Sequence, residues 1–162
     1  MEATRSDEPT ARNPTTVERK SDRELVVTRT FDAPARLVFE AWSNPELFQR
    51  WWVPKSMGME LHACEMDVRT GGTYRLNFGE GMDFFGRYLE VTPPSLIVWT
   101  NEEGGEDSSV TTVTFEERDG RTLLVMSELY PSKEALDAAG TGAVDVTQET
   151  FVQLDELLVT LH

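Results

Sequence analysis

The sequence predicts an α+β fold, in which an antiparallel sheet is followed by one long C-terminal helix. Three observations support this prediction. Short segments with alternating apolar and polar residues fill the stretch from 59 to 129, separated only by brief glycine or proline turns. Apolar residues at helical spacing occur before this stretch, near 37–51, and again after it, at 144–161. Because strands and helices are segregated, consecutive strands are expected to pair as a meander.

The first 22 residues are expected to form a disordered tail, because they are rich in Thr, Pro and charged residues and have almost no bulky apolar ones. Residues 23–162 are expected to form a single domain, which is long enough to bury a core. Glu24 to Phe31 (ELVVTRTF) predicts the first strand of that domain.

Two short helices are predicted after this strand. Asp32 is expected to cap the first helix, which has Pro34 in its opening turn and an apolar stripe that includes Trp42. Asn44 is expected to cap the second helix, which runs to Trp51.

Six more strands make a predicted total of seven: 59–66, 73–79, 83–92, 95–102, 108–117 and 121–129. Asp119-Gly120 indicates a tight hairpin turn between the last two. Thr111, Val113 and Phe115 are expected to share one face. Within 84–91 either alternate row can face inward, and Gly86 could mark a bulge that switches the faces.

The last helix is expected at 144–161. Pro131-Ser132 introduces the helical region, with Ser132 as its cap, and Gly140 and Gly142 are expected to interrupt it. Phe151, Leu154, Leu158 and Leu161 then form an apolar stripe at spacings of three and four residues.

The charge and composition exclude several classes of function. The net charge of −14 disfavours binding to nucleic acid and to anionic membranes. The single cysteine, Cys64, cannot form an internal disulfide, and neither a signal peptide nor a membrane span is evident, so a cytoplasmic protein is expected. Lone His62 and the terminal His162 do not make a metal site, and no nucleotide-binding or hydrolase motif occurs, so no cofactor is expected.

Short motifs are spread over most of the chain: Val27 to Pro34, Val38-Phe39 with Trp42, Asn44 to Glu46, Arg50 to Pro54, Glu65 to Arg69 with Gly71-Gly72, Gly86 to Tyr88 with Glu90-Val91, Pro93-Pro94, Thr111 to Glu117, and Leu154 to Leu158. Together these motifs resemble those of the activator-of-heat-shock-protein-90-ATPase homologues, a branch of the START-like (SRPBCC) superfamily that also contains the birch pollen allergens.

The resemblance implies a helix-grip fold, in which a bent antiparallel sheet grips the C-terminal helix around an internal cavity. It transfers no catalytic motif. One departure concerns the cavity directly: relatives often carry Gly-Trp where this chain has Val146-Thr147. Loss of that indole predicts a larger or differently shaped cavity.

The residues expected to line the cavity are apolar or aromatic and lie on the concave face or on the helices next to it. They are Trp42, Trp51, Tyr74, Leu76, Phe78, Phe84, Tyr88, Trp99, Phe115, Met126, Phe151, Leu154 and Leu158. Any of them could instead be a solid core residue. Adjacent Trp51 and Trp52 point about 100 degrees apart on a helix, so one is expected to anchor it while the other reaches the cavity mouth or the surface.

Three functions compete on this evidence. The first is binding of a small apolar or amphipathic molecule in the cavity. The second is a protein-interaction role, a regulator of a chaperone ATPase by family analogy. The third is a cyclase- or dehydratase-like enzyme that would use Glu128, Tyr74 or Tyr88, but the sequence shows no convergence of polar groups, so a non-enzymatic role is preferred.

Overall fold

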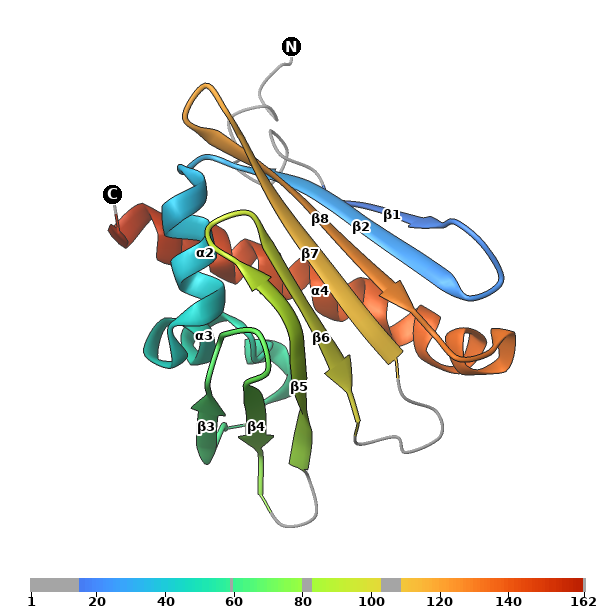
Figure 1. Cartoon of the computed structure of the whole chain (residues 1–162). Helices are drawn as coiled ribbons and strands as arrows, with labels where there is room; N and C mark the ends of the chain where they lie inside the picture. Colours follow the sequence, from blue (N-terminus) through green and yellow to red (C-terminus); the bar gives the residue numbers. More distant parts are fainter. Residues whose placement is uncertain (1–14, 59, 80–82, 103–108, 162) are drawn as a thin grey trace.

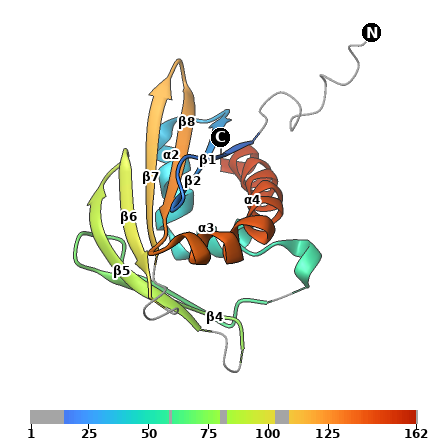
Figure 2. The ribbon, with the colours of Figure 1, turned by 90° about the vertical axis from the view of Figure 1, so that its right-hand side faces the viewer.

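Eight antiparallel strands form one bent sheet in a computed structural model that describes residues 15–58, 60–79, 83–102 and 109–161, without the side chains of residues 57 and 138–146. The strand order is β1-β2-β8-β7-β6-β5-β4-β3. Figures 1 and 2 show the sheet curving around helices α2, α3 and α4, which all lie on its concave side. The predicted α+β class and helix-grip arrangement are therefore confirmed.

The elements, in chain order, are β1 (Thr16–Arg19), β2 (Glu24–Phe31), α2 (Ala35–Ser43), α3 (Pro45–Trp51), a 3-10 turn (Lys55–Met57), β3 (Ala63–Met66), β4 (Thr73–Asn77), β5 (Asp83–Thr92), β6 (Leu96–Asn101), β7 (Ser109–Arg118), β8 (Arg121–Leu129) and α4 (Lys133–Leu161). The predicted strand at 59–66 is shorter than expected, because the chain enters β3 only at Ala63. Residue 59 lies outside the described residues.

The register of the central strands places one apolar row on the concave face. Val27 of β2 pairs with Met126 of β8, which pairs with Val113 of β7. All three side chains are buried. On β7, Thr111 and Phe115 share this face and are also buried, as the alternation in the sequence predicts.

The segment Thr16–Arg19 corrects the prediction of a disordered tail over residues 1–22. It forms β1, which pairs antiparallel with β2 at the edge of the sheet. The sequence gives little sign of this strand because most of its side chains are exposed. Backbone hydrogen bonds to a neighbouring strand need no apolar side chains. Residues 1–14, the first part of the predicted tail, lie outside the described residues.

The first helix has a different cap from the predicted one. Its N-cap is Pro34, which offers no side-chain bond, and the carboxylate of Glu117 accepts a 2.9 Å hydrogen bond from the Ala35 amide instead. Asp32 pairs with Arg121 at 2.8 Å. The prediction for α3 is confirmed, because Asn44 Oδ1 accepts from the Glu46 amide.

The inner row of β5 is Phe84-Gly86-Tyr88. Tyr88 is buried, whereas Phe85 and Leu89 are 42% and 47% exposed. A Cβ at residue 86 would lie 1.9 Å from the carbonyl oxygen of Thr100, so only glycine allows this close approach. The register shift falls between Tyr88 and Glu90, and not at Gly86 as the sequence suggested.

Helix α4 is continuous over Lys133–Leu161, which corrects both the expected start near 144 and the expected interruption at Gly140 and Gly142. A glycine inside a helix costs only about 1 kcal/mol, which packing elsewhere along the helix can offset. Ser132 caps the helix as predicted, with its Oγ accepting from the Ala135 amide at 3.1 Å. The buried stripe of Phe151, Leu154 and Leu158 packs toward the sheet.

Candidate functional site

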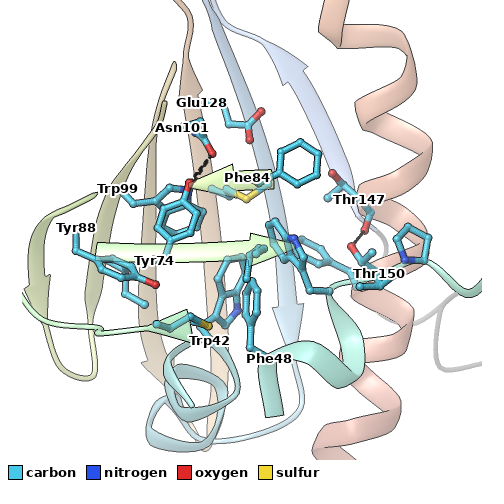
Figure 3. Close-up of a pocket in the computed structure, with 18 of the residues that line it drawn as sticks. Trp42, Phe48, Tyr74, Phe84, Tyr88, Trp99, Asn101, Glu128, Thr147 and Thr150 are labelled. Atoms are coloured by element: carbon cyan, nitrogen blue, oxygen red, sulfur yellow. Dashed lines mark hydrogen bonds between the residues drawn. The ribbon is translucent and has the colours of Figure 1, made fainter. Parts of the chain in front are cut away.

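A cavity of about 410 Å³ lies between the concave face of the sheet and helices α3 and α4. Figure 3 shows the side chains around it. The lining residues are mostly aromatic or aliphatic: Trp42, Phe48, Trp52, Val53, Pro54, Met66, Tyr74, Leu76, Phe78, Phe84, Tyr88, Ile97, Trp99, Asn101, Met126, Glu128, Thr147, Thr150 and Phe151. Such a lining, apolar with a few polar groups, is typical of sites for small molecules.

Most of the residues that the sequence nominated do lie together around this cavity. They are Trp42, Tyr74, Leu76, Phe78, Phe84, Tyr88, Trp99, Met126 and Phe151. Four other nominated residues, Trp51, Phe115, Leu154 and Leu158, are instead buried in the core, away from the cavity lining. Their side chains have the same apolar character, but other side chains fill the space around them.

The two adjacent tryptophans of α3 have different environments. Trp51 has no exposed surface, and its indole Nε1 donates a 2.9 Å hydrogen bond to the carbonyl of Ala41 on α2. Trp52 is partly exposed, lines the cavity and stacks on Phe48, with ring centroids 4.7 Å apart and planes 26° apart. One indole therefore anchors the helix and the other reaches the cavity. The cavity residue is Trp52, whereas the sequence nominated Trp51.

Trp42 lies at the centre of the aromatic part of the lining. Its ring is within 4.8 Å of Trp51 and 5.8 Å of Trp99, measured between centroids, and Phe151 also contacts it. The Trp42 Nε1 is buried and has no hydrogen-bond partner among the described residues. The surrounding ring faces offer only weak N–H···π acceptors, so this end of the cavity is a strongly apolar environment.

Helix α4 holds the chain segment that forms one side of the cavity. The amide of Gln153 donates to the carbonyls of Trp51 and Val53, at 3.0 and 2.9 Å, and its oxygen accepts from the Lys55 amide at 2.9 Å. The carboxylate of Glu149 accepts two further bonds from Ser56. These bonds fix Trp52, Val53 and Pro54 against the helix.

A chain of polar side chains crosses the strands at the other end of the cavity. Asn101 Oδ1 is 3.3 Å from the Tyr74 hydroxyl, and Asn101 Nδ2 donates to Thr111 Oγ1 at 3.0 Å. Thr111 lies opposite Glu128 in the ladder, and its hydroxyl lowers the pKa of that carboxyl. The Tyr130 hydroxyl donates to Glu128 Oε1 at 2.8 Å. In Figure 3, Asn101 and Glu128 lie at the end opposite Trp42 and Phe48.

The pKa values near the cavity follow from burial. Burial raises the pKa of Glu128, and the hydrogen bonds from Tyr130 and Thr111 only partly oppose this effect. Burial also raises the pKa of Tyr88 and of Tyr130, so both phenols stay protonated. Glu128, which the sequence offered only as a group for the enzyme alternative, is partly buried and lines the cavity.

Several lining residues were missed by the sequence analysis: Phe48, Val53, Pro54, Met66, Ile97, Asn101, Thr147 and Thr150. Thr147 had a signal, because the resemblance implied an altered cavity at Val146-Thr147. Phe48 also had one, since it lies on the apolar side of the predicted second helix. Most of the others lie at or next to the ends of strands and helices, where periodicity gives little direction, but Thr150 lies inside α4.

The described part of the chain contains no cluster of three or more His, Cys, Asp or Glu side chains that could hold a metal ion. Burial raises the pKa of the Cys64 thiol, which lies near the sulfur of Met66. A raised pKa disfavours the nucleophilic thiolate. Within the described residues, no helix has the length and apolar character needed to cross a membrane.

Residues 32–159 match the family model described as Activator of Hsp90 ATPase homolog 1-like protein. The match covers most of the chain, so the protein belongs to this family, as the resemblance in its motifs predicted. A search of curated proteins found no match.

Solved structures of bacterial proteins share the fold. A protein from Rhodobacter sphaeroides has a TM-score of 0.81 at 24% identity, covering 91% of this chain and 99% of its own. One from Mycobacterium smegmatis has a TM-score of 0.74 at 25% identity, covering 92% and 100%. CalU16 from Micromonospora echinospora has a TM-score of 0.64 at 21% identity, covering 90% and 84%.

Proposed function

We propose that this protein binds a small apolar or amphipathic molecule in the cavity between its sheet and α4. The observation that carries this proposal is the cavity itself, about 410 Å³ of space with an aromatic lining. Sites for small molecules have volumes of roughly 300–1,000 Å³ and bury most of the ligand surface against apolar side chains. Filling such a space removes apolar area from water on both partners.

The rigidity of the lining supports the same function. Trp51 fixes α3 to α2 through its indole nitrogen, and Gln153 fixes the following segment to α4. A site whose residues are already held in place loses little conformational freedom when a ligand enters. A cytoplasmic location, supported by the single cysteine of the chain, belongs to the same proposal.

The experiment uses the departure at Thr147, which lines the cavity from α4. Thr147→Trp would place an indole in the space, whereas Gln148→Trp would add the same indole at an exposed position of the same helix. Binding of a neutral fluorescent probe, N-phenyl-1-naphthylamine, is measured by titration, and folding of each variant is checked by circular dichroism.

We expect saturable binding to the wild type and to Gln148→Trp, and binding weaker by about tenfold or more in Thr147→Trp, because the indole occupies volume that the probe needs. Equal binding by the three proteins would place the probe elsewhere on the molecule and contradict the proposal. No binding to the wild type by this probe or by a panel of lipids and aromatic polyketides would also contradict it.

Regulation of a chaperone ATPase is the second candidate, and the family match favours it. The acidic surface implied by the net charge of −14 would suit a basic partner. Stimulation of the ATPase of the Hsp90-type chaperone from the same organism tests it. If Thr147→Trp stimulates the ATPase as strongly as the wild type, chaperone regulation is favoured over ligand binding in the cavity. If the wild type gives no stimulation, chaperone regulation is excluded.

A further inference from the structure

Among the described residues that line the cavity, Glu128 is the only one with an ionisable carboxyl or a basic group. It lies on β8 at the end of the cavity opposite Trp42 and Phe48 (Figure 3). The cavity therefore has one apolar end and one end with a single acid. This asymmetry would orient a ligand that has both an apolar body and a polar group.

The hydrogen bonds around Glu128 have a consistent direction. The Tyr130 hydroxyl donates to Glu128 Oε1. Asn101 Nδ2 donates to Thr111 Oγ1, so the hydroxyl hydrogen of Thr111, the ladder partner of Glu128, is not used in that bond. Tyr130 thus acts as a donor, and Glu128 acts as the acceptor. A carboxylate has about four acceptor sites, so it can take further donors from a ligand.

No basic group of the protein balances this acid in the described part of the chain. The groups that shift the pKa of Glu128 are burial, Tyr130 and Thr111, with no cation among them. A buried acid without a cation is costly to ionise, and a cation brought by a ligand would offset that cost.

We propose that Glu128 binds the ammonium group of an amphipathic amine whose apolar body extends toward Trp42 and Phe48. This inference depends on the proposed function, because it assigns the polarity of the ligand to that same cavity. The raised pKa of Glu128 agrees with it, since an ammonium group would stabilise the ionised form that burial disfavours. The strongly negative net charge also favours the approach of a cation over an anion.

The test compares three probes of similar shape: 1-naphthylmethylamine, 1-naphthylmethanol and 1-naphthoic acid. Their affinities are measured by calorimetry for the wild type, Glu128→Gln and Glu90→Gln. Glu90 is exposed on β5, so its variant makes the same change in net charge away from the cavity. In the wild type we expect the amine to bind most tightly and the acid most weakly.

In Glu128→Gln the preference for the amine over the alcohol should fall by about tenfold or more, because a charge-assisted hydrogen bond is lost. Binding of the alcohol should persist, and Glu90→Gln should behave as the wild type. An amine preference that survives in Glu128→Gln would overturn the inference and leave the proposed function standing. Failure of all three probes to bind the wild type would contradict both.

A pH series on the wild type keeps the inference testable if Glu128→Gln does not fold. Because burial raises the pKa of Glu128, lowering the pH should protonate this carboxyl before the exposed glutamates, and binding of the amine should then weaken while binding of the alcohol does not. The other titratable groups that line or contact this part of the cavity are the phenols of Tyr74, Tyr88 and Tyr130, and burial raises the pKa of Tyr88 and of Tyr130. An amine affinity that does not change with pH would overturn the inference.

Discussion

Arg29 of β2 and Asp155 of α4 form an ion pair inside the protein, between the sheet and the C-terminal helix. The guanidinium of Arg29 is almost fully buried and also donates a 2.8 Å hydrogen bond to the carbonyl of Phe151. It lies above the ring of Phe31, 4.8 Å from the centroid. An arginine in an apolar row thus connects the two layers that enclose the cavity.

Removing the acid of this pair is expected to destabilise the protein strongly. Asp155→Ala would remove the carboxylate that pairs with the buried guanidinium of Arg29, and breaking a buried ion pair typically costs about 3–5 kcal/mol. Urea denaturation monitored by circular dichroism measures the loss. The control is Glu116→Ala, which breaks the exposed pair with Arg118 and should cost less than about 1 kcal/mol. If both variants lose the same free energy of unfolding, burial does not make the Arg29–Asp155 pair more stabilising than an exposed pair.

The stability of the protein should depend on pH through Glu128. Because burial raises its pKa, its contribution is fully present below the unfolded value, about 4.3, and is lost as pH rises through the folded value. Glu128→Gln removes this titration. The melting temperature of the variant, relative to the wild type, should therefore increase as pH rises from about 4 to about 8. Parallel pH profiles for the two proteins would contradict a raised pKa.

The side chain of Gln153 is expected to stabilise the protein through its hydrogen bonds to the segment after α3. Gln153→Ala leaves the carbonyls of Trp51 and Val53 and the Lys55 amide without their side-chain partner, which should cost about 1–3 kcal/mol. Gln148→Ala, at an exposed position of the same helix, is the matched control and should change little. Hydrogen exchange of the Lys55 amide should also accelerate in Gln153→Ala. An unchanged exchange rate would contradict the proposed contact.

The Cys64 thiol should react slowly with disulfide reagents. Burial raises its pKa, so the thiolate fraction at neutral pH is below that of an exposed cysteine. The rate of reaction with 5,5′-dithiobis(2-nitrobenzoic acid) in native buffer, compared with the rate in denaturant, measures this. A native rate at or above the denatured rate would indicate an activated thiol and contradict the raised pKa.

The sequence was sufficient to predict the fold where apolar residues alternate clearly. The inner row of Thr111, Val113 and Phe115 follows from a period of two, and the Asp119-Gly120 turn follows from turn chemistry. It was insufficient where backbone pairing alone forms an element. β1 has few buried side chains, so its composition resembles that of a disordered tail.

The site was predicted in part, for a physical reason that Trp51 and Phe115 illustrate. Periodicity tells which face of an element points inward, but not whether the space in front of a side chain is filled. Phe115 faces inward and meets Phe39 and Trp42, whereas Tyr88 faces inward and lines the cavity. For the two adjacent indoles, the choice depends on how α3 is rotated against α2, which is a tertiary property.

The four tryptophans provide the most direct test of the central claim, that the space between the sheet and α4 is open to an apolar molecule. Their indole N–H signals are followed by two-dimensional NMR during titration with neutral 1-naphthylmethanol. Trp42, Trp52 and Trp99 line the cavity, whereas Trp51 lies outside its lining and is fully buried. We predict saturable shifts of the first three signals and a much smaller shift for Trp51. Unchanged signals for Trp42, Trp52 and Trp99 at saturating probe would contradict the account.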